Sequence, residues 1–102
     1  MKPRRRLQRN RRRLLAEVHG QGGSQVLPAG GGWSAVLRLP AVRTDEEDCV
    51  ALLEGHDLLV HPGYFFDFPA GTYLVVSLLP EPPVFAEGVE RLAAYLESRG
   101  PA

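Results

Sequence analysis

Residues 73–79, with the sequence YLVVSLL, restrict the fold of this chain more than any other segment. The segment is almost continuously apolar, and its adjacent valines are β-branched, a composition that favours a strand. A strand this apolar has to be covered on at least one face by the rest of the chain. The sequence therefore predicts that residues 73–79 form a central strand of a sheet.

Two other segments have the properties of strands. From Trp33 onward every second residue belongs to one apolar face, which predicts a strand over residues 33–39 that Pro40 ends. Residues 58–60 are Leu-Leu-Val and predict a short buried strand. The glycine-rich segment before Trp33 allows at most one more short strand, at residues 25–27.

A helix is predicted between these strands. Residues 44–47 read Thr-Asp-Glu-Glu, a capping-box sequence whose acids suit the positive end of a helix dipole. We expect Val50, Leu52 and Leu53 to form the buried face of this helix. Gly55 is expected to end it.

Apolar residues also recur at helical spacing near both ends of the chain. Prolines at 80, 82 and 83 precede a pattern that predicts a last helix, which residues 100–101 stop. Residues 4–19 predict a first helix with Leu7, Leu14, Leu15 and Val18 on one side. Because that stripe is narrow, this helix needs another element to pack on.

The resulting order is helix, strand, helix, strand, strand, helix. It predicts an α+β fold, a small α/β lobe whose mixed, mainly antiparallel sheet has three or four strands and carries its helices mainly on one face. We divide the chain into a helical arm (residues 4–19), a glycine-rich loop (20–32) and a domain (33–99). A chain of 102 residues, 44% of them hydrophobic, can bury one small core.

The formal net charge is zero, but the charges are segregated. Eight of the twelve Lys and Arg residues lie in the first 13 positions, which contain no acid, and Lys2 is the only lysine. Arginine-rich helices can bind the phosphates of RNA or DNA. No aromatic residue interleaves with these arginines, however, and the leucines among them have core spacing, so the sequence disfavours nucleic-acid binding.

Other functional classes are also disfavoured. No apolar run approaches the roughly 20 residues of a membrane span, and the basic start lacks the apolar segment of a secretory signal. The single Cys49 cannot form an internal disulfide, and we expect it to be a buried, unreactive thiol in a cytoplasmic protein. His19, His56 and His61 match no metal-binding spacing, so we expect no metal site.

An aromatic cluster follows Pro62-Gly63. It contains Tyr64, Phe65 and Phe66, with Phe68 close behind. Such a cluster either covers the core or lines a pocket for an organic ligand or cofactor. The residues alone do not separate these two possibilities.

Several motifs are informative in combination. They are residues 31–40 (GGWSAVLRLP), residues 52–54 (LLE), residues 59–66 (LVHPGYFF), the strand at 73–78 and the final amphipathic helix. In this order they resemble the C-terminal, small domain of the fold type I (class I and II) pyridoxal-phosphate-dependent aminotransferases. Arg9-Asn10 with Leu14 looks like the helix that leads into that domain, so the resemblance covers residues 4–98.

The resemblance implies a function. The chain is expected to be a substrate-capping domain or fragment of a transferase that moves an amino group between an amino acid and a 2-oxo acid. In that family the cofactor and its lysine belong to a large upstream domain, and Lys2 matches no family motif. We therefore expect no catalytic or cofactor-binding residue here, no activity and no cofactor in the isolated chain, and the large domain, in cis or in trans, as partner. A homodimer is also possible.

The resemblance also implies a substrate pocket bordered by Trp33 and by Tyr64, Phe65 and Phe66. Most family members carry an arginine in the strand after the aromatic loop, where it binds the substrate carboxylate; Val75 stands there in this chain. Either the substrate presents no carboxylate at that point, or another group such as Arg38 takes over, or the activity is lost. Arg38 alternates to the face opposite Trp33, which makes it a weak substitute.

The second hypothesis is a protein of another class. In it, the chain is a stand-alone, non-enzymatic module whose arginine-rich first helix binds RNA, DNA or an acidic partner.

Overall fold

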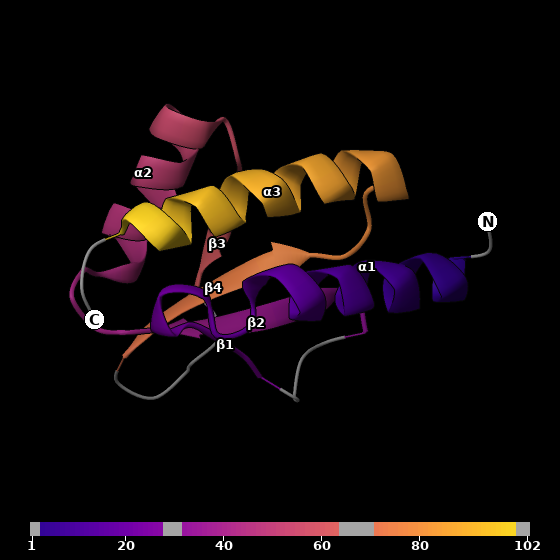
Figure 1. The fold of residues 1–102 in the computed structure, drawn as a ribbon, viewed down its shortest axis with the longest axis horizontal. Helices are drawn as coiled ribbons and strands as arrows, with labels where there is room; N and C mark the ends of the chain where they lie inside the picture. The colour runs from indigo at the N-terminus through magenta and orange to yellow at the C-terminus, as the bar shows by residue number, and fades with distance from the viewer. Residues whose placement is uncertain (1–2, 28–31, 64–70, 100–102) are drawn as a thin grey trace.

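The computed structural model describes residues 3–27, 32–63 and 71–99, and in these the chain forms an α+β domain, as the sequence predicts (Figure 1). In chain order the elements are α1 (Pro3–Val18), the 3-10 turn η1 (Gln21–Gly23), β1 (Gln25–Val26), β2 (Ser34–Leu39), α2 (Asp45–His56), β3 (His61–Pro62), β4 (Thr72–Ser77) and α3 (Pro82–Ser98). Among the described residues, none of the helices combines the length with the apolar composition that a membrane-spanning helix requires.

The four strands form one antiparallel sheet in the order β1-β2-β4-β3. β4 lies between β2 and β3, which confirms that the apolar segment is a central strand. Its neighbour β2 pairs with it over six residues, with Leu37 opposite Leu74 and Val36 opposite Val75. Since side chains alternate across a strand, these two pairs lie on opposite faces of the sheet.

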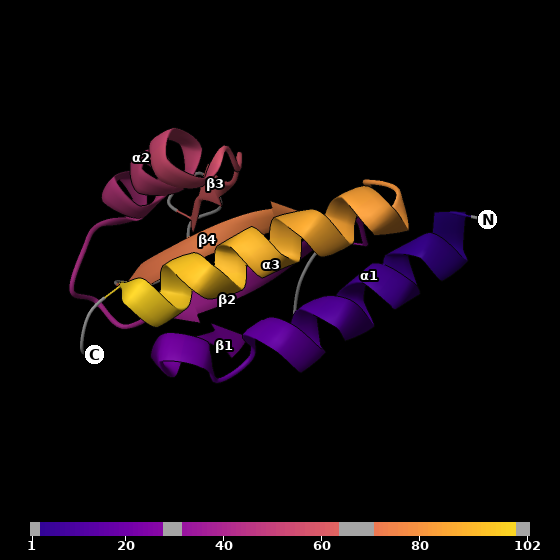
Figure 2. The ribbon, with the colours of Figure 1, turned by 45° about the horizontal axis from the view of Figure 1, so that its top comes forward.

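One sheet face carries the hydrophobic core. α3 crosses this face and α1 runs alongside α3, as Figure 2 shows. The buried apolar side chains that meet there come from α1, β2, β4 and α3. They include Leu14, Val18, Ala35, Leu37, Leu39, Leu74, Phe85, Val89, Leu92 and Leu96. Burial of this apolar surface is the main favourable term in the folding of the domain.

α1 is held by a polar residue as well as by its apolar stripe. Asn10 is 1% exposed, and its side-chain amide donates to the carbonyls of Leu78 at 2.9 Å and Pro80 at 2.8 Å. Leu14 is buried as expected, but Leu15 is 41% exposed and lies outside the stripe. The amide of Asn10 thus supplies hydrogen bonds for the chain where it leaves β4.

The predicted strand at residues 58–60 is wrong. The strand instead consists of His61 and Pro62, which pair with β4. The residues before it are apolar because Leu58 and Val60 pack on the core. The backbone N–H of Leu58 donates to Leu52 at the end of α2, not to a strand.

The capping box of α2 is confirmed. The prediction of its buried face is right for Leu52 and wrong for Val50 and Leu53. Val50 and Leu53 are about half exposed, whereas Asp45, Asp48 and Leu52 are buried. α2 also continues past the glycine that was expected to end it: it runs to His56, and Asp57 follows with a left-handed φ of 52°. Aspartate is one of the few non-glycine residues that adopt this conformation readily.

Asp48 is buried because it forms an ion pair with Arg99, just after α3. The guanidinium donates to both carboxylate oxygens at 2.8 Å, and the two side chains are 0% and 3% exposed. The hydroxyl of Tyr95 also donates to Asp48, and Arg43 donates to that hydroxyl at 3.3 Å. Burial and this bond to Asp48 raise the pKa of Tyr95. Burial alone would lower the pKa of Arg99, but the bond and charge of Asp48 outweigh it and raise the pKa.

We expect Asp48→Asn to destabilise the domain by about 3–5 kcal/mol, because it leaves the charge of Arg99 buried without its counterion. Urea unfolding measures this loss. Glu87→Gln is the control, since the Glu87–Arg91 ion pair is exposed and should contribute less than about 1 kcal/mol.

The double variant Asp48→Leu/Arg99→Met checks the cause. Removing both charges should recover a large part of the stability that the single variant loses. A double variant as unstable as Asp48→Asn would show that hydrogen bonds to other groups, and not the isolated charge, account for the loss.

Candidate functional site

The sheet face opposite the helices contains two of the residues expected in a substrate pocket. Val75 and Arg38 both lie on this face. Val75 is paired with Val36 of β2, and Arg38 is two residues after Val36 on the same strand, so its side chain points to the same side. Val36 and Val75 are each 4% exposed, whereas Arg38 is exposed. Arg38 is therefore a diagonal neighbour of Val75 across two adjacent strands.

Trp33 lies apart from this pair. It precedes β2 and shares the alternation of Ala35, whose side chain faces the core. Its backbone is fixed, because its carbonyl accepts from the N–H of Leu78 at 2.8 Å, but its side chain is 68% exposed. The sheet therefore places Arg38 with Val75 and separates both from Trp33. The other candidates, Tyr64, Phe65 and Phe66, lie outside the described residues.

Sequence reasoning missed His61 as a neighbour of these residues. In the register of β3 and β4, His61 is directly opposite Val75, and its side chain is exposed. The imidazole and the guanidinium of Arg38 thus flank Val75 from the strands on either side. Only the strand pairing brings them together, because His61 and Arg38 are far apart in the sequence.

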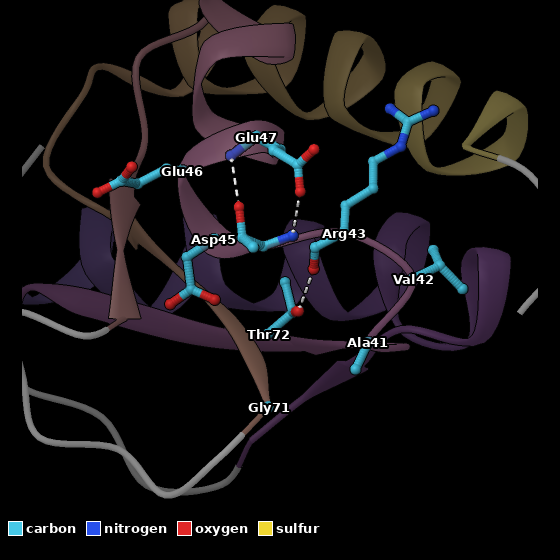
Figure 3. Close-up of a pocket in the computed structure, with 9 residues that line it drawn as sticks. Ala41, Val42, Arg43, Asp45, Glu46, Glu47, Gly71 and Thr72 are labelled. Atoms are coloured by element: carbon cyan, nitrogen blue, oxygen red, sulfur yellow. Dashed lines mark hydrogen bonds between the residues drawn. The ribbon is translucent and has the colours of Figure 1, made fainter.

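A hollow at the start of α2 gathers several polar groups (Figure 3). Thr44 and Glu47 bond to each other twice: the Glu47 carboxylate accepts from the Thr44 N–H at 2.8 Å, and the Glu47 N–H donates to the Thr44 hydroxyl at 3.2 Å. Thr72 donates to the carbonyl of Arg43 at 2.5 Å, and Asp45 accepts from the N–H of Tyr73 at 3.2 Å. The last two bonds fasten the start of α2 to β4, so polar groups of the hollow hold these two elements together.

The hydrogen bond from the backbone of Thr44 is the largest cause of the lowered pKa of Glu47, followed by the bond to the Thr44 side chain. A carboxyl whose pKa is lowered on folding stabilises the fold above its ordinary pKa of 4.5, and this stabilisation is lost as the pH falls. We therefore expect Glu47→Gln to reduce the urea midpoint at pH 7 and to have less effect at pH 3. Glu54→Gln, elsewhere on α2, is the control, and an equal effect of Glu47→Gln at both pH values would contradict the prediction.

Cys49 is partly buried beside the acids of α2. Burial, and then the charges of Asp45, Asp48 and Glu46, raise the pKa of its thiol to about 11. Since the thiolate is the nucleophile, and a thiolate of higher pKa is also the more reactive one, the folded chain should react with a disulfide reagent at pH 8 about ten- to twentyfold more slowly than free cysteine. The urea-unfolded chain is the control. A folded-state rate within about threefold of the unfolded one would contradict an unreactive Cys49.

The described residues contain no group of three or more His, Cys, Asp or Glu side chains that could hold a metal ion. The arginines of α1 divide into two sets. Arg6 and Arg11 donate to the carbonyls of Leu79 at 3.3 Å and Ser34 at 3.2 Å, and Arg13 pairs with Glu17. The other set is exposed: Arg4, Arg5, Arg9 and Arg12.

Comparisons with known proteins give a structural match only. No protein-family model matches the chain, and no curated protein sequence is similar to it. Among solved structures, the chain is similar to the crystal structure of YbdL from Escherichia coli, for which a methionine aminotransferase function has been identified. The TM-score is 0.71 at 20% sequence identity, and the match covers 86% of this chain but 24% of YbdL.

This similarity shows that the chain has the fold of part of an aminotransferase. The chain spans about a quarter of the length of that protein.

Proposed function

We propose that this chain is the substrate-capping part of a pyridoxal-phosphate-dependent aminotransferase, as the resemblance of its motifs implies. The observation that carries the proposal is the similarity to a methionine aminotransferase over 86% of the chain, with a TM-score of 0.71. The order of motifs between residues 31 and 78 supports the same reading independently. The capping role consists of closing over the substrate and selecting it, while the cofactor supplies the chemistry.

The described residues do not fit as the site of the cofactor itself. The only lysine of the chain is Lys2, outside the described residues, so none of these can form the covalent link to pyridoxal phosphate. In the proposed enzyme the cofactor therefore belongs to the large domain, joined to this chain in cis or in trans.

Within the proposed enzyme, Arg38 is the strongest candidate for binding a substrate carboxylate near Val75. It is an exposed guanidinium on the same sheet face, and guanidinium groups bind carboxylates through two parallel hydrogen bonds. His61, on the other side of Val75, offers a second polar contact. The resemblance also implies that Trp33 and residues 64–66 border the substrate. Because Trp33 lies apart from Arg38 and Val75, it would contact a different part of the substrate.

The native protein tests the proposal. An antibody against α3 should detect, in extract of the source cells, either a polypeptide several times larger than 11.2 kDa or this chain with a copurifying partner. The captured material should contain pyridoxal phosphate and transaminate at least one amino acid from a broad panel. Capture of the 11.2 kDa chain alone, without cofactor or activity, would refute the proposed function.

In that enzyme, Arg38→Gln should raise the KM for the amino acid about tenfold or more with a smaller effect on kcat, because a charged hydrogen bond to the substrate is lost. Arg91→Gln removes an equal charge from the outer side of α3 and should leave the KM unchanged. Equal KM values for both variants would exclude Arg38 as the carboxylate ligand.

A further inference from the structure

The exposed arginines of α1 have no partner within the described part of the chain. Arg4, Arg5, Arg9 and Arg12 make no hydrogen bond or ion pair there, although the rest of the chain contains all twelve acidic residues. The last three of these arginines are spaced at i, i+4 and i+7, so they form a ridge on one side of the helix. Both ribbon views place α1 at the edge of the molecule, with α3 along its inner side (Figures 1 and 2).

The fold adds an aromatic side chain to this basic helix. Trp33 lines a hollow together with Arg4, Gln8 and Arg11, although more than 20 residues separate it from them in sequence. Arg9 and Arg12 line a second hollow, with Pro82 and Pro83 at the start of α3. Arg4 and Arg5 therefore lie on the part of α1 between Trp33 and the second hollow.

The indole of Trp33 is 68% exposed while its backbone is held by Leu78. Trp33 thus lies beside Arg4, at one border of the basic helix. The sequence disfavours nucleic-acid binding because no aromatic residue interleaves with the arginines, and the fold supplies one from another segment.

We propose that Arg4, Arg5, Arg9, Arg12 and Trp33 form a binding surface for single-stranded nucleic acid. Proteins bind single strands by combining a positively charged track for the phosphates with an aromatic platform on which a base stacks. A helix rises about 1.5 Å per residue, so the ridge from Arg5 to Arg12 extends about 10 Å. Phosphates in a stacked strand follow one another about every 3.4 Å along its axis, so the ridge can span about three nucleotides.

Single strands fit this surface better than an acidic protein or a duplex. An acidic protein would use the arginines but has no need of an exposed indole, and a duplex keeps its base faces stacked. Apart from Trp33, the binding surface consists of residues outside the proposed substrate site, since Arg38 and Val75 lie on the sheet face opposite the helices. The inference therefore does not depend on aminotransferase activity, and either can fail without the other.

Trp33 is the only tryptophan of the chain, so its fluorescence reports contact at this surface directly. Titration of the 102-residue chain with short single-stranded oligouridine should quench this fluorescence as a base stacks on the indole. Inorganic polyphosphate carries the charge without bases and should bind without comparable quenching. Equal quenching by both probes, or none by oligouridine, would overturn the proposal.

Charge variants test the arginines. For single strands the slope of log K against log salt is about −0.7 for each phosphate contact, so Arg9→Gln/Arg12→Gln should make the slope less negative by about 1.4. Arg38→Gln/Arg91→Gln removes the same charge from other faces and should leave the slope unchanged. Neither Arg9 nor Arg12 has a bond in the described structure, so their replacement should not unfold the chain. Equal slopes for the two variants would contradict the proposal.

Aromatic variants test the stacking, with labelled oligouridine as the probe. Trp33→Ala should weaken binding about tenfold, whereas Trp33→Phe should retain most of the affinity. Two results together would instead assign the surface to an acidic protein. Trp33→Ala would leave the affinity for oligouridine unchanged, and polyglutamate would bind the chain, or displace oligouridine from it, equally well.

Discussion

The buried contact between Asp48 and Arg99 determines where the middle of the chain lies. Leu52 is the one large apolar side chain of α2 that is fully buried, so hydrophobic packing alone does little to fix the position of this helix. The bidentate ion pair fixes the helix to the end of α3, while Asp45 fixes its start to β4. A buried ion pair adds little net stability over an apolar contact, but it penalises every arrangement in which one charge loses its partner. β3, which follows α2 and places His61 beside Val75, depends on this arrangement.

Local pattern predicted most of the secondary structure because the relevant forces are local. The capping box at Thr44, the alternation after Trp33 and the apolar central strand all depend on residues within a few positions of each other. The buried face of α2 could not be found in this way. Its acids match the preference of a helix start for negative charge, and nothing nearby shows that Asp48 is buried, because its partner lies 51 residues away. The hydrophobicity of Val50 and Leu53 predicts that they belong to the core, yet about half of each residue is exposed.

The candidate site shows the same division between local and long-range information. Alternation from Trp33 along β2 is enough to predict that Arg38 and Trp33 point to opposite faces of the sheet. Strand pairing was needed to show that Arg38 shares a face with Val75 and that His61 lies across from it. In the sequence, His61 is only a histidine without a metal motif. Its position beside Val75 could not be predicted, because strand register depends on contacts between segments distant in the chain. Asn10 was missed for a related reason: a polar residue in a helical stripe indicates a buried hydrogen bond only once its acceptors, near the end of β4, are known.

Trp33 connects the two proposed roles of the chain. It would border the substrate in the capping enzyme, and it completes the basic surface on α1. A ligand that stacks on the indole from the arginine side and a substrate that needs the same ring would therefore compete for it. By thermodynamic linkage, each would weaken the binding of the other by the same factor. If both proposals hold, the affinity of the enzyme for its substrate would fall when nucleic acid occupies α1, and the exposed indole would be the physical cause of that coupling.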